Sequence, residues 1–269
     1  MTHDEVAGET SRFDRGGREK LRALATAWPP RRSSALLAFS TLLAAALAGY
    51  YAASESLPEL STWADVAVLS FLLIPAVFAL VYAVLPLWRA NGLLLLALAL
   101  GALAAVLAAA DLDAAANFAK AAAVTLGGFW FLRYFENLTW VVIVAAAIPW
   151  IDAISVWRGP TRHIVEEQDE LFTTLSIAFP LPGEQASANL GLPDVLFFAL
   201  FLAAAVRFEL RVLWTWVAMT LSFGATLALA VALDVAGLPA LPGLCLAFLA
   251  VNADLIWRRL RTHDTPSTA

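Results

Sequence analysis

Eight stretches of about 20 mostly apolar residues follow one another along this chain, and they constrain its fold more than any other feature. An α-helix of this length crosses the roughly 30 Å hydrocarbon core of a bilayer. Of the 269 residues, 61% are hydrophobic and only 14% are charged. We therefore expect an all-α, polytopic transmembrane helix bundle with about eight spans. The predicted spans are residues 35–53, 65–88, 91–110, 114–133, 138–157, 190–208, 211–233 and 238–257.

The connections between these runs predict how the chain is organised. Most are very short and leave room only for antiparallel helix hairpins, but residues 158–189 form a long loop rich in acid, proline and glycine. Loops of this length are usually functional or disordered, and the segment FTTLSIAF within it favours a short strand or hairpin. The predicted parts are an N-terminal segment (1–34), a four-span half (35–133), a second half that carries the loop (134–257) and a tail (258–269).

The N-terminal segment precedes the first apolar run. It is too long and too polar for a cleavable signal peptide. Around residues 18–28 we expect a short interfacial helix, which the Pro29-Pro30 pair would end because proline lacks the amide donor that a helix needs.

The basic residues predict the orientation of the bundle. With eight spans, seven basic residues before the first span fall on the same side as Arg89, Arg133 and Arg207, whereas most acidic residues fall on the other side. Lysine and arginine favour the cytoplasmic side of a membrane. We therefore expect a multi-pass protein of the cell membrane with both termini in the cytoplasm and loop 158–189 outside.

Two aspartates lie inside the predicted spans on either side of the long loop. Asp152 is about five residues, or roughly 8 Å, from the outer end of its span, and Asp194 is at a similar distance into the next span. Taken singly, Asp152 is explained by a side chain that reaches the interface, and Asp194 by the preference for acids in the first turn of a helix. Together, at matched depth on antiparallel helices, they predict a pair of facing carboxylates.

A facing pair of carboxylates suits peptide hydrolysis. Two carboxyl groups at close range share one proton, because both cannot easily be ionised. The ionised member activates water, while the protonated member donates to the carbonyl oxygen. This chemistry uses neither a metal nor a cofactor, and we expect none, since Cys245 is the only cysteine and the three histidines are widely scattered.

A proline-rich stretch, GLPALPG at 237–243, opens the last predicted span on the same side. Pro239 and Pro242 cannot donate backbone hydrogen bonds, so the stretch favours an unwound backbone that would pair with an extended peptide. An ordinary helix N-terminus, where proline is also common, is the alternative.

These residues resemble the intramembrane aspartyl proteases of the presenilin and signal peptide peptidase type, and most closely the archaeal and bacterial members. DAISVW at 152–157, GLPD at 191–194 and PAL at 239–241 stand in the order of that family's motifs, and the resemblance covers about residues 115–257. It implies a presenilin-like core. It also implies that Asp152 and Asp194 are the catalytic dyad, and that Gly191, Leu192, Pro193, Pro239, Ala240 and Leu241 shape the active site and hold substrate.

The chain departs from the family pattern in three ways. Ile151 stands where a tyrosine is usual, and Pro193 replaces the second glycine of the Gly-x-Gly-Asp motif, which leaves Gly191 as the flexible residue. Pro193 either preforms the start of the helix or hinders a rearrangement that activity needs. One span is also missing relative to the usual nine, and its loss before the dyad is compatible with the predicted orientation.

The resulting hypothesis is an intramembrane aspartyl endopeptidase that cleaves within transmembrane segments, with remnant signal peptides as one candidate class. Its expected partners are transmembrane-helix substrates or signal peptides and the lipid bilayer, with no nucleic acid. The alternatives are a transporter or proton-coupled carrier that uses the same carboxylates, and a catalytically silent relative that binds helices.

Other polar and small residues have simpler interpretations. Lys120, with Asn117 one turn before it, is interpreted as a side chain that snorkels to the interface rather than as a contact inside the bundle. Asn252 and Asp254 are interpreted as part of a solvated interfacial ion pair with neighbouring arginines. Gly127-Gly128 predicts a close approach between helices.

Overall fold

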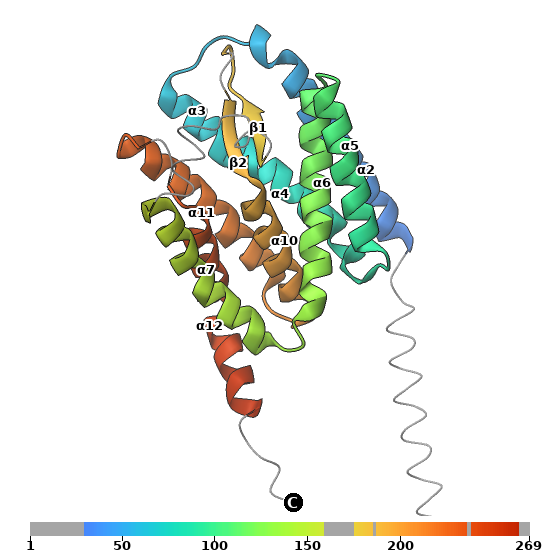
Figure 1. Cartoon of the computed structure of the whole chain (residues 1–269), viewed down its shortest axis with the longest axis vertical. Helices are drawn as coiled ribbons and strands as arrows, with labels where there is room; N and C mark the ends of the chain where they lie inside the picture. The colour runs from blue at the N-terminus through green and yellow to red at the C-terminus, as the bar shows by residue number, and fades with distance from the viewer. Residues whose placement is uncertain (1–29, 159–174, 185–186, 236–237, 264–269) are drawn as a thin grey trace, which may run out of the picture. The chain divides into compact units, whose positions relative to one another are not determined.

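A computed structural model of the chain describes residues 30–158, 175–184, 187–235 and 238–263, and this part is mostly helical (Figure 1). The predicted interfacial helix at residues 18–28 and most of the acidic loop lie outside these ranges. Contacts divide the chain into two units, Met1–Thr41 and Leu42–Ala269. The described part of the first unit is the beginning of one helix, and the following paragraphs concern the second unit.

The described residues contain eight long helices, if Thr62–Arg89 is counted as one. They are α2 (Pro30–Ala53), α3 (Thr62–Val68) with the π-helical η2 (Leu69–Leu73), α4 (Ile74–Val84) and η3 (Leu85–Arg89), then α5 (Leu93–Ala109), α6 (Asp113–Phe131), α7 (Leu138–Arg158), α10 (Leu192–Arg207), α11 (Val212–Ala232) and α12 (Leu241–His263). Two short 3₁₀ turns, η1 (Ser54–Ser56) and η4 (Leu132–Tyr134), follow α2 and α6. Each long helix begins and ends within a few residues of a predicted span, apart from the earlier start of α2, so the helix positions are confirmed.

Within the described residues, four helical segments are long and apolar enough to cross a membrane: Ala35–Ser56, Thr62–Arg89, Val212–Ala232 and Leu241–Arg261. This number is smaller than the eight predicted spans. Two further apolar stretches, Leu93–Ala109 and Leu138–Asp152 (the first part of α7), are shorter. The fold is that of a mostly helical, multi-pass membrane protein.

Large apolar side chains on the outer faces of the helices fit this conclusion. Leu95 on α5 is 74% exposed, and Phe71, Trp150 and Leu246 on three other helices are exposed to a similar degree. A water-soluble domain rarely leaves so much contiguous apolar surface uncovered. In a bilayer the same surface contacts lipid tails.

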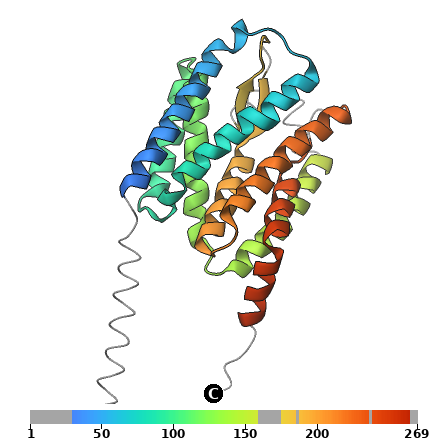
Figure 2. The ribbon, with the colours of Figure 1, turned by 180° about the vertical axis from the view of Figure 1, so that it is seen from behind.

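Helix α10 is the core of the second unit. It lies between α6 and α11 in both views (Figures 1 and 2). Its residues from Phe198 to Ala205 are completely buried, and Phe78 of α4 stacks on Phe198 with 3.7 Å between ring centroids. A helix that is apolar all round is buried on all sides, so protein rather than lipid surrounds α10. With 16 residues, α10 is also shorter than the roughly 20 residues that cross a bilayer.

A two-stranded antiparallel hairpin precedes α10. β1 (Ser176–Pro180) pairs with β2 (Ser187–Gly191), with Ser176 opposite Gly191. The predicted strand character of the FTTLSIAF segment is therefore confirmed at β1. The prediction was wrong for residues 190 and 191, which end β2 instead of beginning a helix. The reason is local, because Gly191 has extended backbone angles and is the N-cap of the helix, which begins only at Leu192.

Candidate active site

Asp194 lies where the hairpin changes into α10. Gly191 is the last residue of β2 and the N-cap of the helix, so Asp194 is the third helical residue. Its carboxyl group lies beside Gly191 and interacts with the backbone N–H of that residue. A carboxylate that reaches back from this position satisfies an N–H group that has no partner within the helix. The helix start itself therefore fixes Asp194.

Gly191 makes space for this carboxylate. Its backbone angles, φ −60° and ψ 138°, are open to any residue, so the described conformation does not by itself require glycine. A Cβ atom on Gly191 would lie 3.0 Å from Oδ2 of Asp194, closer than nearly all real contacts. Glycine is needed here because the carboxyl group of Asp194 lies where a side chain would be.

Pro193 and Leu192 form the first turn of α10. Proline is well suited to this turn because its missing N–H would have no helical partner there. The N–H of Leu192 donates to the carbonyl of Leu175, just before β1, over 2.9 Å. Of the two roles considered for Pro193, the geometry agrees with a preformed helix start.

Asp152 lies in α7 and contacts the beginning of α12. Its carboxyl group interacts with the backbone N–H of Leu241, the first residue of α12. Asp152 therefore lies at the N-terminus of a neighbouring helix, where a negative charge is favoured by the helix dipole. Its second oxygen, Oδ2, is buried and has no hydrogen-bond partner in the described part of the chain.

The proline-rich stretch shows both predicted features, an unwound backbone and a helix N-terminus with proline. Residues Leu238, Pro239 and Ala240 are not helical, and α12 begins at Leu241 with Pro242 in its first turn. The unwound backbone ends at the amide that binds Asp152. The structure thus brings Leu241 to the site, with Pro239 and Ala240 directly before it.

The two aspartates interact electrostatically, and α7, which carries Asp152, contacts both α10 and α12. Each carboxyl group also interacts with a backbone N–H group at the beginning of a helix, Gly191 for Asp194 and Leu241 for Asp152. Like charges that interact in an apolar surrounding disfavour the state in which both are ionised.

Ile151 and Cys245 differ in exposure. Ile151 is 66% exposed, so the position that lacks the family's tyrosine faces outward from the bundle. Cys245 is completely buried, one turn after Leu241 on α12, and the charge of Asp152 acts on its thiol. From the sequence, Cys245 was expected to have neither a metal nor a disulfide role. Its i, i+4 spacing from Leu241 is the signal that places both on one helix face.

Side chains from α2 and α6 close the outer edge of β1. Asn117 binds both backbone groups of Ala178 over 3.4 Å, and Lys120 donates to the carbonyl of Ser176 over 3.3 Å. The hydroxyl groups of Tyr50 and Tyr51 donate to the carbonyls of Pro180 and Ala178. The interpretation of Lys120 as a snorkelling residue is therefore wrong, because it and the buried Asn117 contact the hairpin.

The outer edge of β2 differs from that of β1. The backbone of Ala178 points away from β2, so in an antiparallel ladder the backbone of its partner Asn189 points away from β1. Within the described residues, no hydrogen bond is found for the N–H and C=O groups of Asn189 on this edge. The open edge leads directly to Gly191 and Asp194.

Asn252 and Asp254 are at the other end of α12 and do not belong to this site. Asn252 is completely buried and binds Thr215, the carbonyl of Phe248 and the N–H of Arg211, so it is not a solvated residue. Asp254 forms a two-pronged ion pair with Arg211, at 2.6 and 2.8 Å. The expected interfacial ion pair exists, but its main partner is Arg211 of the preceding connection.

The described residues contain no group of three or more His, Cys, Asp or Glu side chains that would hold a metal ion. Comparison with known proteins adds no relative. No protein-family model, curated protein or solved structure matches this chain.

Proposed function

We propose that this chain is an intramembrane aspartyl endopeptidase of the presenilin and signal peptide peptidase type, with Asp152 and Asp194 as its catalytic dyad. The observation that carries the proposal is the pairing of two carboxyl groups, each held by a helix N-terminus, inside an apolar bundle. Intramembrane carboxylates are costly and usually functional. A structural role alone explains the bonds to Gly191 and Leu241, but not the second buried oxygen of Asp152.

The proposed reaction uses the shared proton. A proton on Oδ2 of Asp152 turns a buried acceptor without a partner into a donor. Asp194, ionised, takes a proton from a water molecule as its oxygen attacks the carbonyl carbon of the scissile bond. The carbonyl oxygen takes the proton of Asp152, and a tetrahedral diol results. The C–N bond then breaks, the amine nitrogen receives a proton from Asp194, and the diol returns one to Asp152.

The open edge of β2 supports a peptide substrate in particular. A transmembrane helix has all its backbone groups paired, so its scissile bond must first become extended. An extended segment would replace its lost helical bonds by pairing with Asn189 on this edge. The next residues of the same strand and helix are Gly191 and Asp194, so pairing would direct the segment toward the dyad.

The membrane arrangement that fits the proposal has eight crossings. Both termini and the ends of α6 and α10 at Arg133 and Arg207 would then be cytoplasmic, and the hairpin would be on the outer side. The short α10 would cross within a protein shell rather than in contact with lipid.

Cleavage of a helical substrate in liposomes tests the proposal. Asp152→Asn and Asp194→Asn are expected to abolish cleavage, because asparagine cannot transfer the proton. Asp254→Asn is the matched control, since Asp254 has a salt-bridge partner at the far end of α12, and cleavage should persist. A peptide isostere with a hydroxyl at the scissile position should bind the wild-type chain. Unchanged cleavage in both dyad variants would refute the proposal, and isostere binding without any cleavage would indicate a silent helix-binding relative.

A proton-coupled carrier is the second candidate, and Asp65 is the observation that favours it. Asp65 is a further carboxyl group and is itself buried, 6% exposed, within the candidate span Thr62–Arg89, and its Oδ1 has no hydrogen-bond partner among the described residues. Buried acids in a row suit proton relays. A carrier would acidify the lumen of proteoliposomes in response to a solute gradient and would ignore the isostere.

A further inference from the structure

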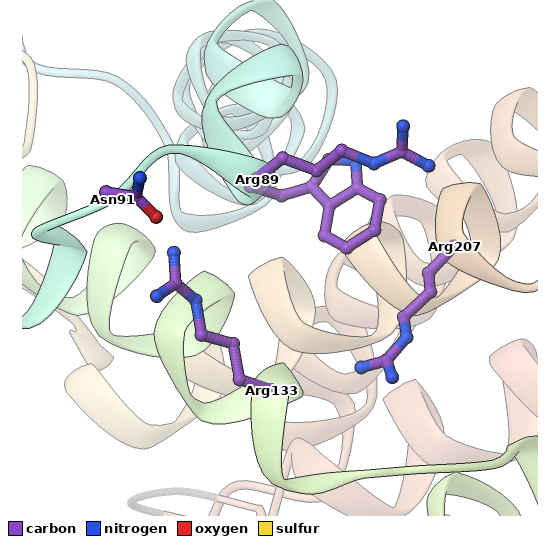
Figure 3. A pocket seen from close by; sticks show the side chains of 5 residues that line it. Arg89, Asn91, Arg133 and Arg207 are labelled. Atoms are coloured by element: carbon purple, nitrogen blue, oxygen red, sulfur yellow. The ribbon is translucent and has the colours of Figure 1, made fainter.

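Three arginines gather around one pocket at the end of the bundle opposite the hairpin. The pocket, with a volume of about 360 Å³, is lined by Arg89, Arg133, Arg207, Trp88 and Asn91. It is an open hollow at the surface rather than an enclosed cavity. Figure 3 shows Arg133 beside Asn91, while Arg89 and Arg207 extend from the other side. The three arginines come from the ends of three helices, η3, η4 and α10.

Helix capping explains part of this arrangement. Arg207 donates to the carbonyl of Leu132 over 2.7 Å, and Arg133 donates to the carbonyl of Ala90. Cations at helix C-termini are also favoured by the helix dipole. Each guanidinium has five N–H donors, so these bonds leave most of the donors of Arg133 and Arg207 unused. Arg89 has no hydrogen bond in the described part of the chain and stacks on Trp88, 4.7 Å from the ring centroid.

No carboxylate balances the charge of this pocket within the described residues. The described ion pairs join Arg211 and Arg258 to Asp254, and Arg259 to Glu209. Three guanidinium groups around one cavity therefore repel one another unless an anion neutralises them. Guanidinium groups bind phosphate with two parallel hydrogen bonds each, so a phosphate with several oxygens satisfies converging arginines better than a single carboxylate.

We propose that this pocket binds the phosphate of an anionic phospholipid headgroup. Apolar side chains beside it favour a lipid over a soluble phosphate: Leu87 is 46% exposed and Tyr134 is 65% exposed, next in sequence to Trp88 and Arg133. Aromatic residues and arginines concentrate at the membrane interface, and basic pockets between helix ends recognise lipid headgroups. The proposal depends on the membrane character of the chain and not on its peptidase activity.

The test measures lipid binding by the purified full-length chain. Native mass spectrometry in a neutral detergent counts bound dioleoyl phosphatidylglycerol and, in parallel, dioleoyl phosphatidylcholine. We expect the wild-type chain to prefer phosphatidylglycerol, and Arg89→Gln to weaken this binding about fivefold, the usual effect of one arginine near a membrane surface. Arg89→Gln is the most informative variant, because it removes no capping bond of a helix end. Arg133→Gln and Arg207→Gln should weaken binding at least as much.

Arg258→Gln is the control, since it removes one charge from the same end of the bundle and outside the pocket. Equal weakening by Arg258→Gln and Arg89→Gln would refute the proposal, because it would indicate a general charge effect. Competition by glycerol phosphate, which has no acyl chains, is a second experiment. If it displaces phosphatidylglycerol at equal concentration, the site is one for soluble phosphates and the lipid assignment is wrong.

Discussion

The carboxyl group of Asp152 interacts with the backbone N–H of Leu241, so an acid of one helix lies at the beginning of another. This interaction gives the aspartate a structural role as well as its proposed catalytic one. The two roles separate by mutation, because asparagine keeps the acceptor oxygen and alanine removes it.

Asp152→Ala is expected to lower the free energy of unfolding by about 1 kcal/mol relative to Asp152→Asn, the usual value of an N-terminal cap. Thermal unfolding in detergent measures the difference. Both variants should be equally inactive toward a helical substrate. If Asp152→Asn is as unstable as Asp152→Ala, the bond to Leu241 does not stabilise the start of α12.

Gly191→Ala is expected to reduce cleavage severalfold while the chain still folds. Alanine adopts the backbone angles of Gly191, but its Cβ would require the carboxyl group of Asp194 to move by a few tenths of an ångström. A displacement of about 1 Å costs roughly a hundredfold in rate, so this smaller displacement costs less. Initial rates with a helical substrate measure the loss, and Gly101→Ala, in open space on α5, is the matched control. Wild-type rates in Gly191→Ala would contradict the described position of Asp194.

The open edge of β2 gives a prediction about substrate binding. Asn189→Pro removes one N–H group from this edge, and prolines are tolerated where the N–H faces away from the partner strand. Asn189→Ala keeps the N–H and removes only the side chain, whose oxygen lies 3.2 Å from the hydroxyl of Ser176. We expect KM for a helical substrate to rise severalfold in Asn189→Pro relative to Asn189→Ala. Equal KM values would indicate that substrates do not pair with this edge.

The predicted role of the Gly127-Gly128 pair is confirmed for one of its two residues. A Cβ on Gly128 would lie 2.5 Å from the carbonyl oxygen of Leu196 in α10, whereas a Cβ on Gly127 would meet nothing within 4 Å. Gly128→Ala should therefore cost about 1–3 kcal/mol of stability through overpacking. Gly127→Ala should be neutral or slightly stabilising, because alanine favours helices. Unfolding midpoints in detergent measure both, and equal midpoints would contradict the close contact between α6 and α10.

Two threonines on α11 form a matched pair. Thr215 accepts a 2.8 Å hydrogen bond from Asn252, whereas the hydroxyl of Thr220 is buried with no partner among the described residues. Thr215→Val leaves the amide of Asn252 without this acceptor and should cost about 1–3 kcal/mol. Thr220→Val removes an unsatisfied group and should be neutral or stabilising. A comparable loss in Thr220→Val would reveal a partner for its hydroxyl, such as a water in the relay that the carrier hypothesis requires.

The helix positions were predictable because bilayer thickness sets the length of an apolar run. The matched depth of Asp152 and Asp194 stays a prediction, which rests on counting residues from the end of each predicted span. The end of β2 was not predictable, because Leu190 and Gly191 continue into an apolar run that reads as helix.

Contacts between residues far apart in the sequence could not be predicted from local sequence patterns. Tyr51 and Ala178 are 127 residues apart, and Asn117 and Ala178 are 61 apart. No periodicity relates a tyrosine at the end of one helix to a carbonyl in a later loop. The same holds for Asp152 and Leu241, which a proline motif suggests only by resemblance. The amide that binds Asp152 became visible only with the position of α12.

Cys245 allows access to the interior of this protein to be measured directly. It is the chain's only thiol, it is completely buried, and it lies beside Asp152. Any alkylating reagent that adds its mass to the intact chain must therefore have reached this one atom. The rate of that reaction reports how often the bundle opens next to the dyad, without an introduced label. An inhibitor or a helix that occupies the site would block access to Cys245 and slow the reaction.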